Sequence, residues 1–309
     1  MARSGRELYV GVTDGSWYEF LSSRPGIDEV NFWRPGGRGL LRAPQGAPLL
    51  FKRRSPQNAI AGLGFVEYVD RMSIADAWEF YGSKNGAASL DELVRTIGRI
   101  LKKPVDRFHI IGCAILSQPV FFPESVWIAQ PASWKPNIVQ GEYFDMDSGE
   151  GALMWHEIKE RLGSRMPPLA TSEIAPFGGR GKPALYLPRQ GQGTFRRFVL
   201  AAYGNRCAVT GEHSVPVIDA AHIADFAEHQ RHEISNGIAL RSDIHKLFDR
   251  GYVSIRPDHT FVVSKALAEE FNNGKVYYEM HNAKVTLPDN PALRPNAEYL
   301  ERHYAKLRK

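Results

Sequence analysis

Short runs of apolar and β-branched residues, separated by Gly, Pro and polar clusters, dominate the first half of the chain. Each run has the length of a strand and ends at residues that favour turns. These runs predict strands over residues 8–12, 48–52, 60–66, 109–116 and 126–129. The pattern is typical of a sheet or a small barrel.

Two segments in the same half have apolar residues at helical spacing instead. One predicted helix spans residues 74–81 and follows Ser73, a good N-cap residue. The other spans residues 90–102, where Ser89 and Glu92 stand in capping-box spacing. Strands interrupted by two helices predict an α+β fold for this half.

The second half of the chain has another order of elements. Its apolar pattern predicts a helix, two strands, a helix and a hairpin, over residues 195–203, 215–223, 237–241, 243–250 and 252–263. A polar loop separates the two strands, and the second strand runs directly into the helix. Strand, loop, strand and helix thus form one unit of local structure.

The segment between the two halves, residues 167–183, is rich in Pro, Gly and Ser and lacks hydrophobic periodicity. It predicts a linker over residues 166–184. The two predicted domains are therefore residues 1–165 and 185–309, which suits a chain of 309 residues.

Composition narrows the class of protein. The formal net charge of +5 is a mild excess, compatible with a surface that binds phosphate but insufficient to establish one. Cys113 and Cys207 are too few for a disulfide scaffold. The longest apolar run, Phe108–Leu116, is shorter than the roughly 20 residues that cross a bilayer, and the start of the chain lacks the pattern of a secretory signal. We expect a cytoplasmic protein without a membrane partner.

Four polar residues stand at the element ends of the second half. Asp219 and His222 lie on the first predicted strand, Asn236 precedes the second, and His245 lies in the first turn of the helix. Phosphodiester hydrolysis needs a base that works near neutral pH and a cation that offsets charge on the leaving oxygen. One histidine suits the first task, and a second histidine with a carboxylate suits the second.

This arrangement resembles the HNH, or ββα-metal, nuclease family. The matching blocks are DAAHI (219–223), SNGIAL (235–240) and DIHKLFDRG (243–251). The resemblance implies that His222 is the general base and that Asn236 fixes the loop that orients it. It also implies that His245 and Asp219 hold one Mg²⁺ or Mn²⁺ ion.

The chain departs from the family pattern in two ways. Many members place the second ligand directly before the base, whereas Ala221 stands there and Asp219 falls on the opposite face of an ideal strand. A bulge or a twist is needed to bring Asp219 round. Many members also carry two CxxC pairs, which this chain lacks, so no structural zinc is expected. The residues expected to contact DNA phosphates near this centre are Arg231, His232 and Lys246.

Aromatic and strand residues of the first half resemble the EVE branch of the PUA superfamily. The stretches that carry this resemblance are 31–35, 46–52, 60–65 and 77–82. It implies a β-barrel with helices that reads modified bases. The residues expected at the base pocket are Trp17, Asn31, Trp33, Phe51 and Ser83. The residues expected on the DNA backbone are Lys52, Arg53 and Arg54.

The fusion of these two domains resembles the modification-dependent restriction endonucleases. That family cuts DNA that carries 5-methyl- or 5-hydroxymethylcytosine, and a base inspected on all sides has to leave the stack. One HNH site cuts one strand, so double-strand cleavage predicts a homodimer. Two alternatives stay open: an HNH nuclease whose first domain is directed by sequence or RNA, and a catalytically silent protein that binds modified nucleic acid.

Overall fold

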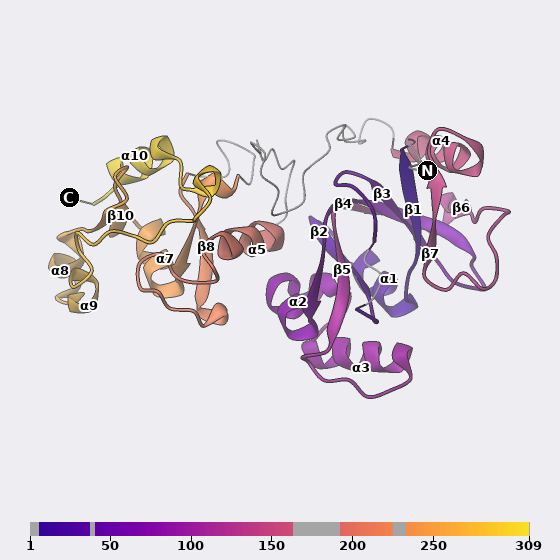
Figure 1. The fold of residues 1–309 in the computed structure, drawn as a ribbon, viewed down its shortest axis with the longest axis horizontal. Helices are drawn as coiled ribbons and strands as arrows, with labels where there is room; N and C mark the ends of the chain where they lie inside the picture. Colours follow the sequence, from indigo (N-terminus) through magenta and orange to yellow (C-terminus); the bar gives the residue numbers. More distant parts are fainter. Residues whose placement is uncertain (1–5, 38–40, 163–191, 225–232, 309) are drawn as a thin grey trace. The chain divides into compact units, whose positions relative to one another are not determined.

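The structure of the chain is a computed structural model that describes residues 6–37, 41–162, 192–224 and 233–308. The chain divides into two compact units, Met1–Gly181 and Lys182–Lys309 (Figure 1). Both units mix strands with helices, which confirms the predicted α+β class. The predicted linker, residues 166–184, lies outside the described residues.

A seven-stranded sheet forms the centre of the first unit. Its strands are β1 (Glu7–Val12), β2 (Glu29–Arg34), β3 (Pro48–Lys52), β4 (Ala59–Ser73), β5 (Ile110–Phe121), β6 (Ile128–Ala129) and β7 (Gly141–Asp145). The strand order is β2-β5-β4-β3-β1-β7, with β6 beside β4. β1 and β3 run parallel and their other pairings are antiparallel. The register between the long strands β4 and β5 shifts twice, and such irregularities bend a sheet.

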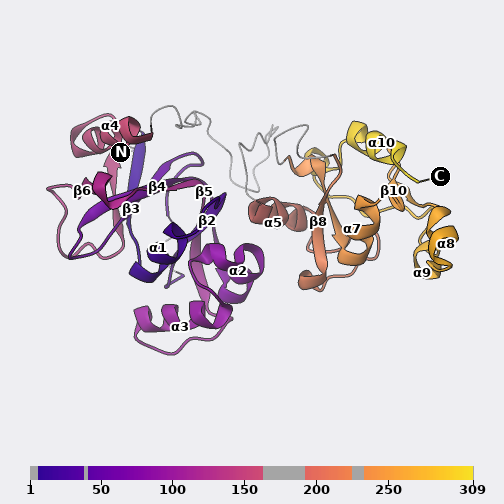
Figure 2. The same cartoon turned by 180° about the vertical axis from the view of Figure 1, so that it is seen from behind.

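Neighbouring residues on these strands face two separate hydrophobic cores. On β3, Leu49 and Phe51 join one core and Leu50 joins the other. The first core also takes apolar side chains from α1 (Gly15–Ser22), α2 (Ile74–Tyr81) and α3 (Leu90–Leu101), and the second takes them from α4 (Gly149–Leu162). Figures 1 and 2 accordingly show α4 beside β1 and β7, far from α2 and α3.

Helix caps in this unit follow the sequence prediction. The Ser73 side chain accepts a hydrogen bond from the Asp76 backbone N–H, and Ser89 accepts one from Glu92. The strand β2 was not predicted, because Glu29 and Asn31 break its apolar pattern although both are fully buried. An ion pair of 2.9 Å with Lys84 offsets the charge of Glu29.

The second unit is built around the hairpin of β8 (Ile218–His222) and β9 (Gly237–Arg241), which pair antiparallel. Two helices, α5 (Gln192–Ala202) and α7 (Ser242–Asp249), pack against this hairpin, and β8 lies between them in Figures 1 and 2. The predicted strand start at Val215 is wrong. Residues Val215–Val217 form a short 3-10 turn, because Pro216 has no N–H to donate to a strand partner.

The remaining elements close the second unit. They are β10 (Val253–Ile255), β11 (Phe261–Val263), α8 (Ala266–Phe271), α9 (Lys275–Tyr278) and α10 (Ala297–Ala305). α10 buries Leu300, and its His303 ring stacks on Phe248 at 3.5 Å. The last residues of the chain therefore complete the core of this unit. Among the described residues, no helix is both long and apolar enough to cross a membrane.

Candidate nuclease centre and aromatic cavity

β8 and α7 bring two of the predicted metal ligands together. The Nδ1 atom of His245 lies 3.2 Å from Oδ2 of Asp219. The other ring nitrogen, Nε2, lies 3.3 Å from Oδ2 of Asp249, one helical turn further along α7. Asp249 was missed by the sequence analysis, although its i+4 spacing from His245 was a visible signal. The imidazole is therefore held between two carboxylates on opposite edges.

The pair of Asp219 and His245 fits a divalent cation. Two ligands about 2.1 Å from one octahedral ion, in neighbouring positions, lie about 3 Å apart. The observed 3.2 Å matches this separation. Among the described residues, no three His, Cys, Asp or Glu side chains gather closely enough to hold a metal ion. This agrees with the geometry, because Asp249 faces the far edge of the His245 ring. Mg²⁺ usually keeps several waters and takes few protein ligands.

The Asp219 side chain reaches His245 without a β-bulge in β8. The pairing of β8 with β9 runs from Ile218 to His222 without a shift of register. Burial along β8 nevertheless repeats every three residues: Ile218 and Ala221 are buried, whereas Asp219 and His222 are partly exposed. Strand twist is larger in two-stranded ribbons than in wide sheets, which accounts for the loss of simple alternation.

Asn236 holds the chain that follows His222. Its side-chain oxygen accepts a hydrogen bond of 2.8 Å from the Ala224 N–H, and its amide donates one of 3.1 Å to the Ala224 carbonyl. Its backbone carbonyl also accepts from the N–H of Ile223. The Asn236 side chain is almost completely buried. This geometry suits a residue that fixes the loop after the predicted base.

His222 lies at the end of β8 with one ring face covered. Its imidazole stacks on the ring of Phe195 from α5, with a centroid distance of 4.0 Å and an interplanar angle of 7°. Phe195 is fully buried, whereas His222 is partly exposed. The sequence analysis placed Phe195 only at the start of a predicted helix, residues 195–203.

Two charged residues at the start of α7 form an ion pair. Arg241 forms two hydrogen bonds with the carboxylate of Asp243, and these hold the pKa of Asp243 down at about 2. The Arg241 backbone N–H donates to the buried sulfur of Cys207 at 3.2 Å. Lys246, on the same helix, is exposed. The other two residues predicted to meet DNA here, Arg231 and His232, lie outside the described residues.

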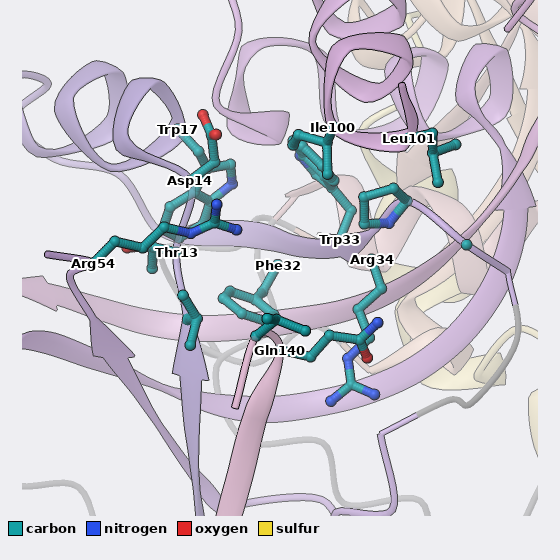
Figure 3. Close-up of a pocket in the computed structure, with 14 residues that line it drawn as sticks. Thr13, Asp14, Trp17, Phe32, Trp33, Arg34, Arg54, Ile100, Leu101 and Gln140 are labelled. Carbon is teal, nitrogen blue, oxygen red and sulfur yellow. The ribbon is translucent and has the colours of Figure 1, made fainter. Parts of the chain in front are cut away.

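The first unit contains a cavity of about 400 Å³. It lies where five segments meet: the end of β1 with the start of α1, β2, the segment after β3, the end of α3 and the segment before β7. Its lining residues are Val12, Thr13, Asp14, Trp17, Phe32, Trp33, Arg34, Pro35, Gly36, Arg54, Ile100, Leu101, Val139 and Gln140 (Figure 3). Three predicted recognition residues, Trp17, Trp33 and Arg54, are therefore brought to one cavity.

Both tryptophans of the cavity have their indole N–H groups bound elsewhere. Trp17 Nε1 donates to the backbone carbonyl of Asn31 at 3.0 Å, and Trp33 Nε1 donates to that of Asn85 at 2.8 Å. Both side chains are at most 9% exposed. Phe32 adds a third aromatic ring, packed edge-on against Trp17. The cavity therefore offers aromatic surface that is fixed in place before any ligand arrives.

Polar groups occur around the same cavity. Arg34 donates to the Tyr9 hydroxyl at 2.5 Å, and burial raises the pKa of that tyrosine to about 12. Asp14 caps α1 by accepting from the Ser16 N–H. Figure 3 shows the side chain of Arg54 extending along the cavity below Asp14. Within the described parts of the chain, the exposed side chain of Arg54 forms no hydrogen bond or ion pair, and only its backbone carbonyl accepts a hydrogen bond, from the Asn58 N–H.

The other residues predicted for the pocket do not line the cavity. Phe51 is fully buried and stacks on Phe121. Asn31 is fully buried and donates to the Asn85 side chain at 2.8 Å. Ser83 accepts a hydrogen bond from Arg24 on the surface. These three residues lie outside the cavity lining, among core or surface groups of the unit, and their contact with a base stays a prediction.

Lys52 and Arg53 point inward rather than toward solvent. The Lys52 ammonium donates to the Arg53 carbonyl and lies 4.9 Å from the Trp134 ring centroid, and burial lowers the pKa of the lysine. The Arg53 guanidinium pairs with Glu19 at 3.0 Å. Both side chains are engaged within the unit, and their contact with DNA phosphates stays a prediction.

Comparison with known proteins gives a different match for each of the two units. The first resembles the ASCH protein of Zymomonas mobilis at 11% identity and a TM-score of 0.33, over 50% of this chain and 96% of that one. A mutant of the same protein gives 11% identity and a TM-score of 0.34 over 50% and 97%. No curated protein matches the sequence. Residues 207–256 match the family described as HNH endonuclease. This stretch contains β8, β9 and α7, so the second unit carries an HNH endonuclease domain.

Proposed function

We propose that the chain is a modification-dependent DNA endonuclease of the restriction type. Its HNH domain hydrolyses the phosphodiester backbone, and its first unit receives a flipped cytosine that carries a 5-methyl or 5-hydroxymethyl group. Two copies act together on double-stranded DNA, because one HNH centre cuts one strand.

The observation that carries this proposal is the aromatic cavity in the unit that lacks the nuclease centre. Its volume of about 400 Å³ lies within the usual range for small-molecule sites and accepts one unstacked base. Base–aromatic stacking contributes about 1–3 kcal/mol per base where a ring face is open, and Trp17, Phe32 and Trp33 form the aromatic wall of the cavity. Thr13, Asp14 and Gln140 supply hydroxyl, carboxylate and amide groups at the same cavity, and groups of these kinds read the edges of bases.

The nuclease chemistry is divided among residues of the second unit. His222 accepts the proton of the attacking water, and Asn236 keeps the segment after it in place through Ala224. Asp219 and His245 hold the divalent cation, and Asp249 orients the His245 ring from its far edge. When bound, Mg²⁺ or Mn²⁺ supplies positive charge that offsets the charge developing on the departing 3′ oxygen.

The test is cleavage of three duplexes of one sequence, with plain, methylated or hydroxymethylated cytosine, in the presence of Mg²⁺ or Mn²⁺. We expect cleavage that depends on the metal and is at least tenfold faster on one modified duplex. Equal cleavage of all three duplexes contradicts the proposed recognition of modified cytosine, but it leaves the assignment of nuclease activity in place. No cleavage under any condition, with binding retained, supports the silent binding protein.

A sequence- or RNA-directed first unit is the competing function. Arg34 and Arg54 at the cavity favour it, because guanidinium groups bind phosphate and the guanine edge. Equal cleavage of the three duplexes, together with a preference among unmodified sequences, distinguishes this alternative.

A further inference from the structure

The helix α5 lies outside the stretch that matches the HNH family, yet it contacts β8 at both ends of the strand. At the start of β8, the guanidinium of Arg196 donates to the backbone carbonyls of Val215 and Ile218, each at 3.0 Å. At its end, Phe195 covers the ring of His222. Neighbouring residues of one helix thus hold both ends of the strand that carries the proposed base.

A glycine opposite His222 allows this close approach. Gly237 is the cross-strand partner of His222 in the register of β8 and β9. A Cβ atom at Gly237 would lie 2.9 Å from the ring of Phe195 and 2.4 Å from the side chain of Val199. Any larger residue would therefore push α5 away from the hairpin at the level of His222.

The stacked geometry restricts the motion that matters most for a general base. Rotation of an imidazole about its last side-chain torsion is broad and has no sharp minima. A parallel contact at 4.0 Å and 7° with a buried phenylalanine opposes this rotation, because turning the ring would drive its edge into the Phe195 face. Both ring nitrogens lie in the imidazole plane, so a ring stacked on one face of the imidazole does not cover them.

We propose that Phe195 is a positioning residue for cleavage, which fixes the plane of the His222 ring, and that Gly237 is needed to admit it. The proposal rests on His222 being the general base of the proposed function. It extends the functional part of the nuclease unit beyond residues 207–256 to a helix that the family match does not include.

The test compares two substitutions on α5 in the full-length protein. Phe195→Leu keeps an apolar side chain but removes the flat ring. Leu200→Ala removes the same number of carbon atoms from a residue that is also fully buried on α5. We expect Phe195→Leu to lower kcat about 10- to 100-fold, because small misplacements of a catalytic group have effects of that size. KM and the half-maximal metal concentration stay within about twofold. Leu200→Ala, assayed below its unfolding temperature, keeps kcat within about threefold.

A double-mutant cycle separates positioning from general packing. In the His222→Ala background, Phe195→Leu should have no further effect on the residual rate, since the residue it positions is gone. Gly237→Ala, which keeps both rings, should lower kcat in the same direction as Phe195→Leu. A loss of kcat in Phe195→Leu no larger than in Leu200→Ala, or an undiminished effect in the His222→Ala background, overturns the proposal.

Failure of the proposed function has a different signature. If His222→Ala alone cleaves as fast as the wild type, the assignment of the base falls and the positioning role falls with it. If His222→Ala is inactive but Phe195→Leu matches the Leu200→Ala control, only the positioning role falls. All rates are measured on the duplex that the wild type cleaves fastest, so preference for modified DNA does not enter the comparison.

Discussion

The nuclease centre and the aromatic cavity are held in place by different interactions. In the centre, partly exposed polar side chains hold one another: His245 lies between Asp219 and Asp249. In the cavity, the walls are core side chains, and Trp17 and Trp33 direct their polar atoms to backbone carbonyls. The same aromatic rings thus stabilise the unit and face the cavity.

This difference separates the consequences of substitution in the two regions. Charged groups that take part in chemistry have to remain accessible to water and substrate, so their removal affects rate more than folding. Buried aromatic rings are part of the fold, and truncating one costs about 3–5 kcal/mol of stability. Cleavage rates alone therefore report the roles of residues at the nuclease centre. The cavity is best tested by substituting exposed residues at its edge, because these contribute little to folding stability.

The largest expected effect is on the general base. His222→Ala should lower the rate of metal-dependent cleavage by about 10²- to 10⁴-fold, because the proton of the attacking water loses its acceptor. Single-turnover cleavage measures this rate, and DNA binding should persist. His213→Ala, at an exposed histidine of the same unit, is the matched control and should cleave at the wild-type rate. Undiminished cleavage by His222→Ala would falsify the role of the base.

The two carboxylates beside His245 should differ in their effects. Asp219→Asn removes a proposed ligand and should raise the half-maximal Mg²⁺ concentration by about 100-fold, whereas Asp249→Asn weakens only the orientation of the ring and should raise it by about tenfold. Titrating cleavage against Mg²⁺ measures both values. The reverse order would mean that the cation is held on the Asp249 side of the imidazole.

A buried carboxylate in the first unit should make folding sensitive to pH. Burial raises the pKa of Glu67 to about 7, although Gln45 donates a hydrogen bond to it. The folded state therefore keeps a proton that the unfolded chain releases above about pH 4.5. The free energy of unfolding should fall as pH rises from about 4.5 to 8, by roughly 3 kcal/mol through this residue.

Glu67→Gln isolates this contribution. Relative to the wild type, the variant should gain stability between pH 5 and pH 8, measured by urea unfolding at both pH values. Equal stability differences at the two pH values would show that Glu67 ionises freely in the folded state.

The smallest expected effect is at the rim of the cavity. Arg54→Ala should weaken DNA binding several-fold at low salt and reduce the salt dependence by about one phosphate contact. Folding stability should change by less than about 0.5 kcal/mol, because the side chain is exposed. Arg95→Ala, at an exposed position of α3 away from the cavity lining, is the control. Equal losses in both variants would argue against DNA contact at the cavity.

The nuclease centre was largely predictable from the sequence, since its residues lie within about thirty positions of one another on a simple ββα unit. The resemblance to the HNH family placed Asp219 beside His245, whereas the geometry of an ideal strand argued against it. The stacking of Phe195 was not predictable, because the contact depends on how α5 docks on the hairpin.

The cavity was harder to predict because residues from five separate segments meet there. Local pattern identified Trp17, Trp33 and Arg54 as candidates but did not separate them from Phe51, whose sequence neighbourhood is similarly apolar. Trp33 itself lies on β2, a strand that was not predicted. Gln140 and Leu101 reach the cavity only through the tertiary fold, so no signal in their own segments marks them.

The position of α5 determines which residues have to be included when the nuclease unit is fused to another DNA-targeting domain. A fusion that begins at Cys207, where the family match starts, would leave out Phe195 and Arg196. The His222 imidazole would then lose the ring on which it stacks. A boundary before Gln192 retains both residues. Engineered chimaeras that start fifteen residues earlier should therefore outperform shorter ones in turnover, even where both bind the same DNA.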